Sequence, residues 1–415
     1  MTSPELSAEL SAAGARVRTV LIAGCLISLV GFGARSVLGL FLEPMTGDLG
    51  WSRETFAFAL AVQNLMWGLC VPVAGMLADR FGAARVIAFG ALLYAGGIAG
   101  MALSATPWML HLSAGLVTGL GVAFTAFSLA LAAMARVVGP ERRSMALGLG
   151  TAAGSLGQVV FSPLGQGFIL AFGWQTALLL LAGCTLALLP LAFVLPRTPV
   201  AAGGHPGDDP AQTLRAALGE AGRHRGYVLL TTGFFVCGFH VAFITVHFPA
   251  YVKDLGLGGS VGAMALALIG LFNIVGSFGS GLYGQTHSKK TGLATIYGLR
   301  ALVILGLLLA PKTPLVIGLF AAAMGLLWLS TVPLTTGIVG QVFGLRYMNT
   351  LFGIVFLSHQ LGSFSGVWLG GVLYDAFGTY DPVWWAGVGL SVLAMLLHLP
   401  IDERPLRRRP SAAPA

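Results

Sequence analysis

Twelve apolar stretches, each long enough to cross a bilayer as a helix, are the feature that most constrains this chain. A helix needs about 20 residues to cross a hydrocarbon core about 30 Å thick. Only 9% of the 415 residues are charged and 56% are hydrophobic, which leaves too few charged side chains to cover a water-facing surface. The predicted fold class is therefore an all-α membrane protein with twelve transmembrane helices. They lie at roughly 19–42, 54–78, 85–104, 107–136, 144–172, 175–196, 227–251, 261–284, 291–310, 314–341, 348–373 and 382–400.

A polar interval divides these stretches into two groups of six. It is rich in proline, glycine and arginine, which favours a linker over a membrane span. We expect this linker to be cytosolic and to contain a short amphipathic helix near residues 211–222. The predicted organisation is an N-terminal tail (1–18), a first six-helix bundle (19–196), the linker (197–226), a second six-helix bundle (227–400) and a C-terminal tail (401–415).

The two groups of helices repeat each other in sequence. The loop that follows the second helix, beginning at Gly75, returns after the eighth helix at Gly281, about 206 residues later. The start of the fifth helix at Arg142 is also similar in sequence to the start of the eleventh helix at Arg346. Repeats of this kind are typical of secondary transporters, in which two bundles rock about a central site. We therefore predict two pseudo-symmetric bundles and transport by alternating access.

The positive charges predict the orientation of the chain. Cytoplasmic loops of membrane proteins carry an excess of Lys and Arg. With both termini in the cytoplasm, eighteen positive residues fall inside, and only Arg53, Lys253 and Lys312 fall outside. The net charge of +8 is then a matter of topology, and no nucleic-acid partner is expected. The predicted location is the bacterial inner membrane.

The loop at 75–85, GMLADRFGAAR, resembles the loop motif of the major facilitator superfamily and lies where that family has it, between helices 2 and 3. Glycine at Gly75 allows close helix packing, Gly82 permits a tight turn, and Asp79 offers a carboxylate near helix ends. The resemblance implies that Asp79 supports the outward-facing state by meeting the start of helix 11. It also implies that Arg80 and Arg85 brace the loop.

A narrower resemblance covers most of the chain. Residues 31–59 are similar to the first helix and following loop of the monocarboxylate porter branch, which includes bacterial lactate porters and oxalate–formate antiporters. Helix 11, around Ser358, His359 and Gln360, also resembles that branch. The resemblance implies a secondary active transporter that moves a small organic anion, with a monocarboxylate as the leading expectation. It also implies that Arg35 lies in the substrate path.

Away from the ends of the apolar stretches lie two cations, Arg35 and Arg300, and no carboxylate; all fifteen acids lie in loops, tails or helix ends. A charge inside the membrane is costly, so a functional role is the first hypothesis for each. Arg35 lies about 10 Å below the outer end of helix 1. Its planar guanidinium suits a substrate carboxylate, and the alternative is that it reaches outward to water or bonds to carbonyls. Arg300, on helix 9, is expected to brace neighbouring carbonyls, with substrate contact as the alternative.

Helix 8 departs from the pattern of the branch. Animal relatives carry an Asp and an Arg four residues apart there, whereas this chain has Asn273 and Ser277. The usual buried ion pair and its proton-coupling carboxylate are missing, which leaves proton coupling open. His240 and His359 lie near mid-depth and are candidates for a proton site or a second anion contact. The alternative for both is a hydrogen bond between helices.

The predicted substrate-binding residues lie on helices that line the central cavity of this fold. They are Arg35, Gln63, Asn64, His240, Asn273, His359 and Gln360. No catalytic residue, metal site or cofactor is predicted, because the stretches hold no convergent acids, nucleophiles or metal ligands. The four cysteines are interpreted as small buried side chains.

These features rank the possible functions. The expected partners are a small organic anion and the lipid bilayer, with protons left open, and the protein is expected to be a monomer. A multidrug or metabolite exporter of the same fold is the alternative, disfavoured because the helices hold no buried acid and helix 5 has no Gly-Pro pair. A membrane enzyme or receptor is disfavoured because no catalytic arrangement or soluble domain is present.

Overall fold

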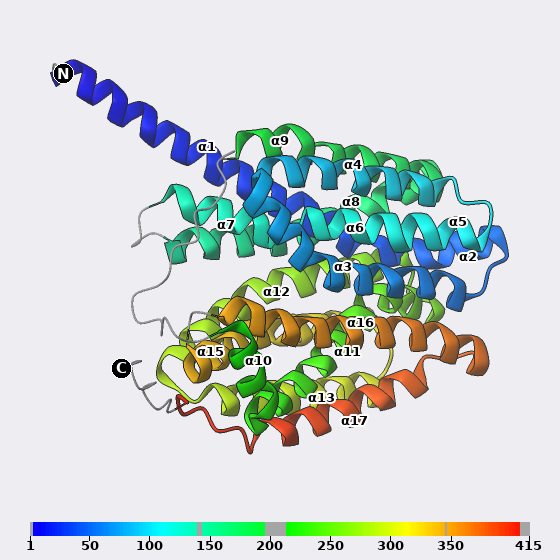
Figure 1. Cartoon of the computed structure of the whole chain (residues 1–415). Coiled ribbons are helices and arrows are strands. Elements are labelled where there is room, and N and C mark those ends of the chain that lie inside the picture. The colour runs from blue at the N-terminus through cyan, green and yellow to red at the C-terminus, as the bar shows by residue number, and fades with distance from the viewer. Residues whose placement is uncertain (1–2, 139–142, 196–212, 345–346, 407–415) are drawn as a thin grey trace. The chain divides into compact units, whose positions relative to one another are not determined.

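A computed structural model describes residues 3–138, 143–195, 213–344 and 347–406. Every regular element in these ranges is a helix, and Figure 1 shows them in chain order. The first part of the chain forms α1 (Ser3–Ser36), η1 (Leu38–Phe41), α2 (Leu42–Leu49), α3 (Arg53–Phe81), α4 (Ala83–Ala102), α5 (Pro107–Leu110), η2 (His111–Val117), α6 (Thr118–Phe124), α7 (Phe127–Val137), α8 (Arg143–Leu186) and α9 (Leu188–Val194). The second part forms α10 (Leu214–Arg223), α11 (Arg225–Asp254), α12 (Gly259–Thr286), α13 (Lys289–Leu309), α14 (Pro314–Leu327), α15 (Thr331–Phe343), α16 (Met348–Phe377) and α17 (Asp381–His398).

Eleven helical segments of the described chain are long and apolar enough to cross a membrane. One of them, Met145–Val194, has 50 residues, which is more than twice the length that a single crossing needs. It is interrupted at Gly173, whose φ of 77° and ψ of 165° are not helical. Glycine adopts a positive φ at little cost, so the chain turns at this point. The segment therefore holds both helices predicted at 144–172 and 175–196, and the predicted all-α membrane fold is confirmed.

The helix predicted at 314–341 is broken near its middle. It ends as α14 at Leu327 and resumes as α15 at Thr331. Pro333 explains the break, because proline has no N–H and its ring clashes with the carbonyl four residues earlier. The carbonyls at the end of α14 are therefore left without their usual helical partners.

The helix predicted at 107–136 is broken as well. The π-helical η2 interrupts its first half, and α6 ends at Phe124 before α7 begins at Phe127. The Thr125 side chain donates to the carbonyl of Gly121 at 2.7 Å. The Thr125 N–H donates to the same carbonyl at 2.9 Å, and a side-chain bond added to a helical bond in this way often bends a helix.

The chain packs as two compact units. Unit 1 comprises Met1–Val200 and Thr245–Leu271, and unit 2 comprises Ala201–Ile244 and Phe272–Ala415. The end of α11, the start of α12 and the turn between them belong to unit 1, whereas the rest of both helices belongs to unit 2. This segment of unit 1, residues 245–271, is called the hairpin below. The division into six-helix bundles at 19–196 and 227–400 stays a prediction.

Unit 1 is built around the packing of α1 along α8. The two helices touch through their backbones, since a Cβ on Gly157 would lie 2.0 Å from the Leu29 carbonyl oxygen. The hairpin of residues 245–271 also packs here through glycine, because a Cβ on Gly39 would lie 2.3 Å from the Thr245 carbonyl oxygen. Close backbone approach at small residues is how membrane helices gain packing energy.

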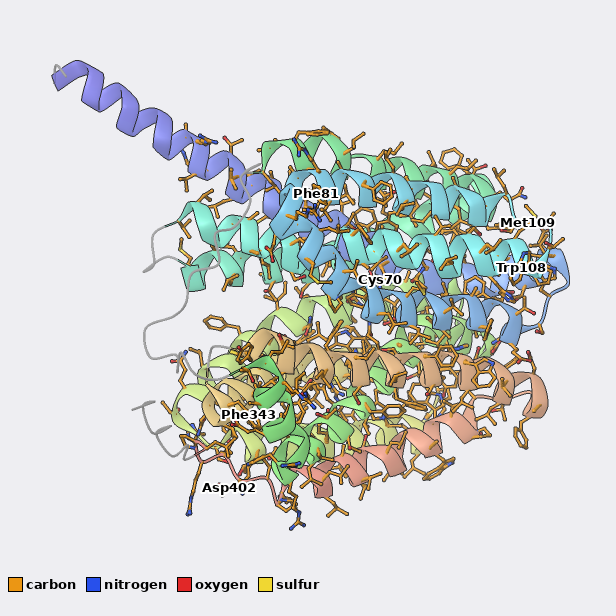
Figure 2. All side chains as sticks on the ribbon, viewed as in Figure 1. Cys70, Phe81, Trp108, Met109, Phe343 and Asp402 are labelled. Atoms are coloured by element: carbon orange, nitrogen blue, oxygen red, sulfur yellow. The ribbon has the colours of Figure 1, made fainter. Side chains whose placement is uncertain are left out.

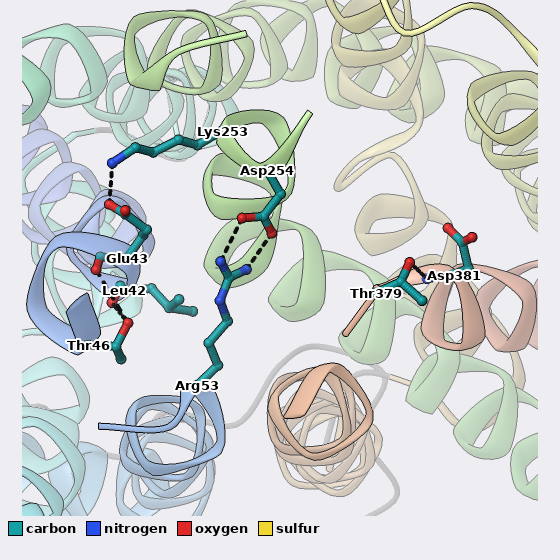
Figure 3. Close-up of polar contacts among 8 residues, drawn as sticks. All are labelled: Leu42, Glu43, Thr46, Arg53, Lys253, Asp254, Thr379 and Asp381. Carbon is teal, nitrogen blue, oxygen red and sulfur yellow. Dashed lines mark hydrogen bonds and ion pairs between the residues drawn. The ribbon is translucent and has the colours of Figure 1, made fainter. Parts of the chain in front are cut away.

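Two ion pairs hold the hairpin to the rest of unit 1. Arg53 donates to both carboxylate oxygens of Asp254, at 2.6 and 2.7 Å, and Lys253 donates to Glu43 at 2.5 Å. Figure 3 shows that neighbouring residues of α11 carry opposite charges and meet opposite charges on α2 and α3. A two-pronged Arg–carboxylate contact fixes geometry as well as charge.

In unit 2, α13 packs against α14, α15 and α17. The segment after α17 crosses the start of α13, where the Glu403 carboxylate accepts from Ser288 Oγ and from the Lys290 N–H, both at 2.8 Å. Gln341 Nε2 of α15 donates to the Glu403 carbonyl at 2.9 Å. An anion at the first turn of a helix stabilises it, so this segment ties α13 and α15 together.

Large apolar side chains lie on the outside of the helices. Phe81, Trp108 and Met109 have exposed fractions of 43%, 68% and 42%, and Figure 2 shows them on α3 and α5. A water-soluble protein rarely leaves so many large apolar side chains exposed, whereas a lipid-facing surface requires them.

The linker and the loop motif are each seen in part. Helix α10 agrees with the predicted short helix near 211–222, while residues 196–212 lie outside the described residues. Gly82 turns the chain between α3 and α4 with a φ of 88°. A Cβ at Gly75 would meet no atom within 4 Å among the described residues, and the predicted close packing there stays a prediction. Asp79, Arg80 and Arg85 are exposed, and their predicted role in the transport cycle stays a prediction.

Candidate functional site

Arg35 lies at the end of α1 and is held by two side chains from α3. Its Nη2 donates to Asn64 Oδ1 at 2.5 Å, and its guanidinium carbon lies 4.3 Å from the centre of the Trp67 ring. Asn64 is fixed in turn, since its Nδ2 donates to the Leu60 carbonyl at 2.8 Å. The ring and the amide together set the plane of the guanidinium.

Arg35 lacks a counter-charge in the described part of the chain. None of the ion pairs among the described residues involves it, and its buried Nε has no hydrogen-bond partner there. A buried donor without a partner costs about 1–3 kcal/mol, and more when it is charged. The site is therefore suited to a ligand that supplies a negative charge.

A small cavity of about 20 Å³ lies beside the Arg35 guanidinium. A single water-sized group needs about 10–15 Å³, so the cavity has room for about one such group, for example one carboxylate oxygen. Ser28 Oγ, which also lines the cavity, is buried and has no hydrogen-bond partner among the described residues. The lining residues are Ile27, Ser28, Gly31, Phe32, Arg35, Trp67, Val122, Thr125 and Ala126.

The break between α6 and α7 forms one side of this cavity, through Thr125 and Ala126. Tyr94 of α4 secures the same region, because its hydroxyl donates to the Gly31 carbonyl at 3.1 Å. α4 and α6 are in close contact there, since a Cβ on Gly121 would lie 2.5 Å from the backbone of Tyr94. α4 is thus packed against α6 and bonded to α1 at Gly31, one of the lining residues.

The two amides predicted on α3 have different surroundings. Asn64 contacts Arg35, as described above, whereas Gln63 Nε2 donates to the Ala114 carbonyl of η2 at 3.0 Å. Gln63 is buried and is absent from the cavity lining. The structure therefore brings Arg35 and Asn64 together and directs Gln63 to helix packing.

Arg300 of α13 is fully buried in unit 2. Its Nη2 donates to the Leu327 carbonyl at 2.7 Å, to the Trp328 carbonyl, and to Cys237 Sγ at 3.6 Å. These carbonyls are the ones released by the break between α14 and α15. Arg300 is thus the carbonyl brace that the sequence predicts.

Asn273 of α12 lies at the same break. Its Oδ1 accepts from the Leu329 N–H and from Ser277 Oγ, both at 3.0 Å. Asn273 and Ser277, which replace the buried Asp and Arg of the branch, therefore bond to each other, and Asn273 also bonds to the backbone at the helix break. The predicted contact of Asn273 with substrate stays a prediction.

The two predicted histidines of unit 2 have different neighbours. His240 Nε2 lies 2.9 Å from the Gly387 carbonyl and 3.4 Å from Ser391 Oγ, so it faces α17. His359 Nδ1 lies 3.1 Å from Gln360 Oε1, and the His359 ring lies 5.0 Å from that of Phe234. Helix–helix contact accounts for His240, while His359 and Gln360 form a local polar pair. Their roles in proton or anion binding stay predictions.

The sequence analysis missed three buried side chains. Trp67 lies one helical turn after Asn64, and Ser28 lies two turns before Arg35, so helical spacing places both on the face of the site. His398 is buried in α17, and its ring stacks on that of Tyr297 at 5.0 Å. Among the described residues, no three His, Cys, Asp or Glu side chains are placed to hold a metal ion.

The fold resembles solved transporter structures. It matches the xylose transporter XylE from E. coli in an inward-open conformation with a TM-score of 0.72 and 12% identity, over 93% of this chain and 96% of that one. It matches a mutant of the nucleoside transporter NupG with a TM-score of 0.72 and 14% identity, over 92% of this chain and 99% of that one. At these identities the likeness concerns the fold.

The sequence has curated relatives as well. Mouse monocarboxylate transporter 11 is 28% identical over 295 residues, covering 70% of this chain and 65% of the relative. Rat monocarboxylate transporter 4 is 26% identical, covering 60% and 54%. Multidrug resistance protein MdtH of Klebsiella pneumoniae is 30% identical, covering 55% and 54%. This chain therefore spans between about half and two thirds of the length of these relatives.

The relatives and structural neighbours named here are transporters and not enzymes, which agrees with the sequence analysis. The family profile of the Major Facilitator Superfamily matches residues 24–366, which is most of the chain. Long apolar helices, the loop at 75–85 and the shared fold all agree with that match. The chain belongs to the major facilitator superfamily of membrane transporters.

Proposed function

We propose that this protein is a secondary active transporter that moves a small monocarboxylate by alternating access. The cavity beside Arg35 carries the proposal, because it pairs one cation, without a carboxylate partner among the described residues, with a largely apolar wall. A monocarboxylate has the matching parts, one negative charge and an apolar remainder. The similarity to monocarboxylate transporters supports the same substrate class.

In this proposal, Arg35 binds the carboxylate, while Asn64 and Trp67 keep the guanidinium plane in place. The cavity has room for about one carboxylate oxygen, and in this proposal the rest of the molecule extends out of it. Binding neutralises a charge that is otherwise isolated in a medium of low dielectric constant. The loaded site therefore costs less free energy to enclose than the empty one, which links occupancy to the transport cycle.

Coupling to protons would need a group other than a carboxylate, because the apolar stretches hold no acid. His359, His240 or the proton of the acid itself would carry it. The positive-inside pattern supports a bacterial inner-membrane protein with both termini in the cytoplasm. We propose that it acts as a monomer.

Uptake into proteoliposomes tests the proposal. Lactate, pyruvate and oxalate are supplied with and without a pH gradient, using the wild type, Arg35→Ala and Lys312→Ala. Lys312 is a matched control, because it follows α13 and its Nζ bonds to carbonyls at the end of that helix, at Leu308 and at the cap residue Ala310. We expect saturable uptake by the wild type and Lys312→Ala, and its loss in Arg35→Ala. The absence of carboxylate uptake, or normal uptake by Arg35→Ala, would refute the proposal.

The second candidate function is export of drugs or metabolites, which the similarity to MdtH favours. A susceptibility assay in cells that express the protein separates the two. Protection against amphipathic dyes that depends on expression would support the exporter, whereas unchanged susceptibility together with carboxylate uptake would exclude it.

A further inference from the structure

Gly31 lies one helical turn before Arg35 on α1, on the same face of the helix, and lines the same cavity. A Cβ at this position would have the Thr125 carbonyl oxygen, at 3.8 Å, as its one neighbour within 4 Å. That distance is an ordinary contact, and Thr125 itself lines the cavity. A side chain at Gly31 would therefore extend into the space beside Arg35 and would not collide with packed backbone.

The second half of the chain has a side chain at the position that matches Gly31 by the spacing of one repeated loop. The loops that begin at Gly75 and Gly281 are 206 positions apart. At that spacing Gly31 matches Cys237, Tyr94 matches Arg300, and Thr125 matches Thr331.

The contacts within the two sets differ in kind. In unit 1, Tyr94 donates to the backbone carbonyl of Gly31 at 3.1 Å. In unit 2, the Cys237 side chain makes the contacts, because its Sγ lies 3.6 Å from Arg300 Nη2 and 3.2 Å from Thr331 Oγ1. A side chain at the matching position of unit 2 is therefore held by polar partners, whereas Gly31 has no side chain beside the cavity.

We propose that Gly31 is the position that admits the carboxylate to Arg35, and that any side chain there excludes it. This inference rests on the proposed function, because it assumes that a carboxylate binds at Arg35. With about 20 Å³ available, the cavity holds little more than one water-sized group, so a single methyl group takes up much of it. Gly31 then determines whether an anion fits and is a specificity-determining residue of the transporter.

The test compares Gly31→Ala and Gly31→Cys with Gly154→Ala. Gly154, on α8, is a matched control, because a Cβ there would also have its nearest neighbours at 3.8 Å, on Phe32 and Ser28, and Gly154 is not among the cavity-lining residues. The readouts are the rate and half-saturating concentration of lactate and pyruvate uptake in proteoliposomes, per folded protein, and the melting temperature. Excluding one methyl group from a binding pocket changes specificity by about tenfold or more.

We expect uptake to fall about tenfold in Gly31→Ala and further in Gly31→Cys, with Gly154→Ala unchanged and all melting temperatures close to that of the wild type. Equal uptake by Gly31→Ala and Gly154→Ala would overturn the inference and leave the proposed function standing. Lost uptake explained fully by a lower folded fraction would make Gly31 a packing position and would also overturn it. If the wild type takes up no carboxylate, the proposed function fails, and this inference fails with it.

Discussion

The two arginines inside the helices differ in what surrounds them. Arg35 of unit 1 has one amide partner, an aromatic ring and a cavity, with a buried Nε that has no partner among the described residues. Arg300 of unit 2 also has buried nitrogens, Nε and Nη1, without a partner among the described residues, but its Nη2 bonds to two backbone carbonyls at a helix break. An arginine that fills a gap in a helix is a structural element, whereas one that faces open space is available to a ligand.

The difference has a local cause. Pro333 releases carbonyls at the end of α14, and these groups need a donor that water cannot supply inside a membrane. In unit 1 the break after α6 contains no proline, and the Thr125 side chain bonds to its own helix. No arginine is needed as a brace there, so the corresponding space beside α1 stays open for Arg35.

The largest effect on transport is expected from Arg35→Gln. Losing a hydrogen bond between charged groups costs about 3 kcal/mol, so carboxylate uptake should fall about 100-fold. The melting temperature should stay the same or rise, because the substitution removes a buried charge without a carboxylate partner. Uptake assays and thermal unfolding in detergent measure the two quantities. A strong loss of stability in Arg35→Gln would show that Arg35 is a brace like Arg300.

Arg300→Gln should give the opposite pattern. It removes charged hydrogen bonds to the Leu327 and Trp328 carbonyls and leaves these carbonyls buried, at a cost of about 3 kcal/mol in the free energy of unfolding. Uptake per folded molecule should stay near that of the wild type. Arg300→Lys keeps the charge and should retain part of the stability. Loss of uptake in Arg300→Gln with unchanged stability would contradict the assignment of a structural role to Arg300 and a binding role to Arg35.

A smaller effect is expected at the ion pairs that hold the hairpin in unit 1. Arg53→Asp replaces attraction to Asp254 with repulsion and should cost about 1–2 kcal/mol of stability at low salt. The double variant Arg53→Asp with Asp254→Arg restores a pair of opposite charges and should recover most of the loss. Thermal unfolding at two salt concentrations measures the loss of stability in the single variant and its recovery in the double variant. Equal melting temperatures for the single and double variants would mean that the pair does not hold the hairpin.

The sequence predicts the membrane-spanning helices well because apolar length is a local property. It also predicts the brace at Arg300, since a membrane arginine on an outer helix has few partners other than carbonyls. Pro333 is a readable signal for the break in the tenth helix. The sequence analysis nevertheless predicts one helix at 314–341, because it weighs overall apolar length above the proline.

The remaining features depend on contacts between helices, which one sequence does not contain. Trp67 stacks on Arg35 only because α1 and α3 approach at that level. Asn64 faces Arg35 and Gln63 faces η2 because of how α3 is rotated about its own axis. The sequence alone does not fix that rotation. Gly75 matches the loop motif, and its predicted packing partner likewise cannot be read from the motif alone.

The smallest expected effect extends the comparison to the loops between the second and third helices of each half. In the first half the loop carries its own acid, the exposed Asp79, whereas the second half has Gln285 at the corresponding position. There the acid comes from beyond α17, as Glu403 at the start of α13. Glu403→Gln should therefore cost about 1 kcal/mol of stability, because it weakens a charged cap at a helix start.

Asp79→Asn is the matched control, because Asp79 is exposed and has no hydrogen bond or ion pair within the described residues. Its melting temperature should equal that of the wild type, while that of Glu403→Gln should be a few degrees lower. A higher salt concentration should reduce the difference in melting temperature between the two variants, because the Glu403 carboxylate stabilises α13 partly through its charge. If the two variants melt alike, the acid of the second half does not hold α13, and the two halves differ in their membrane cores and not in their loops.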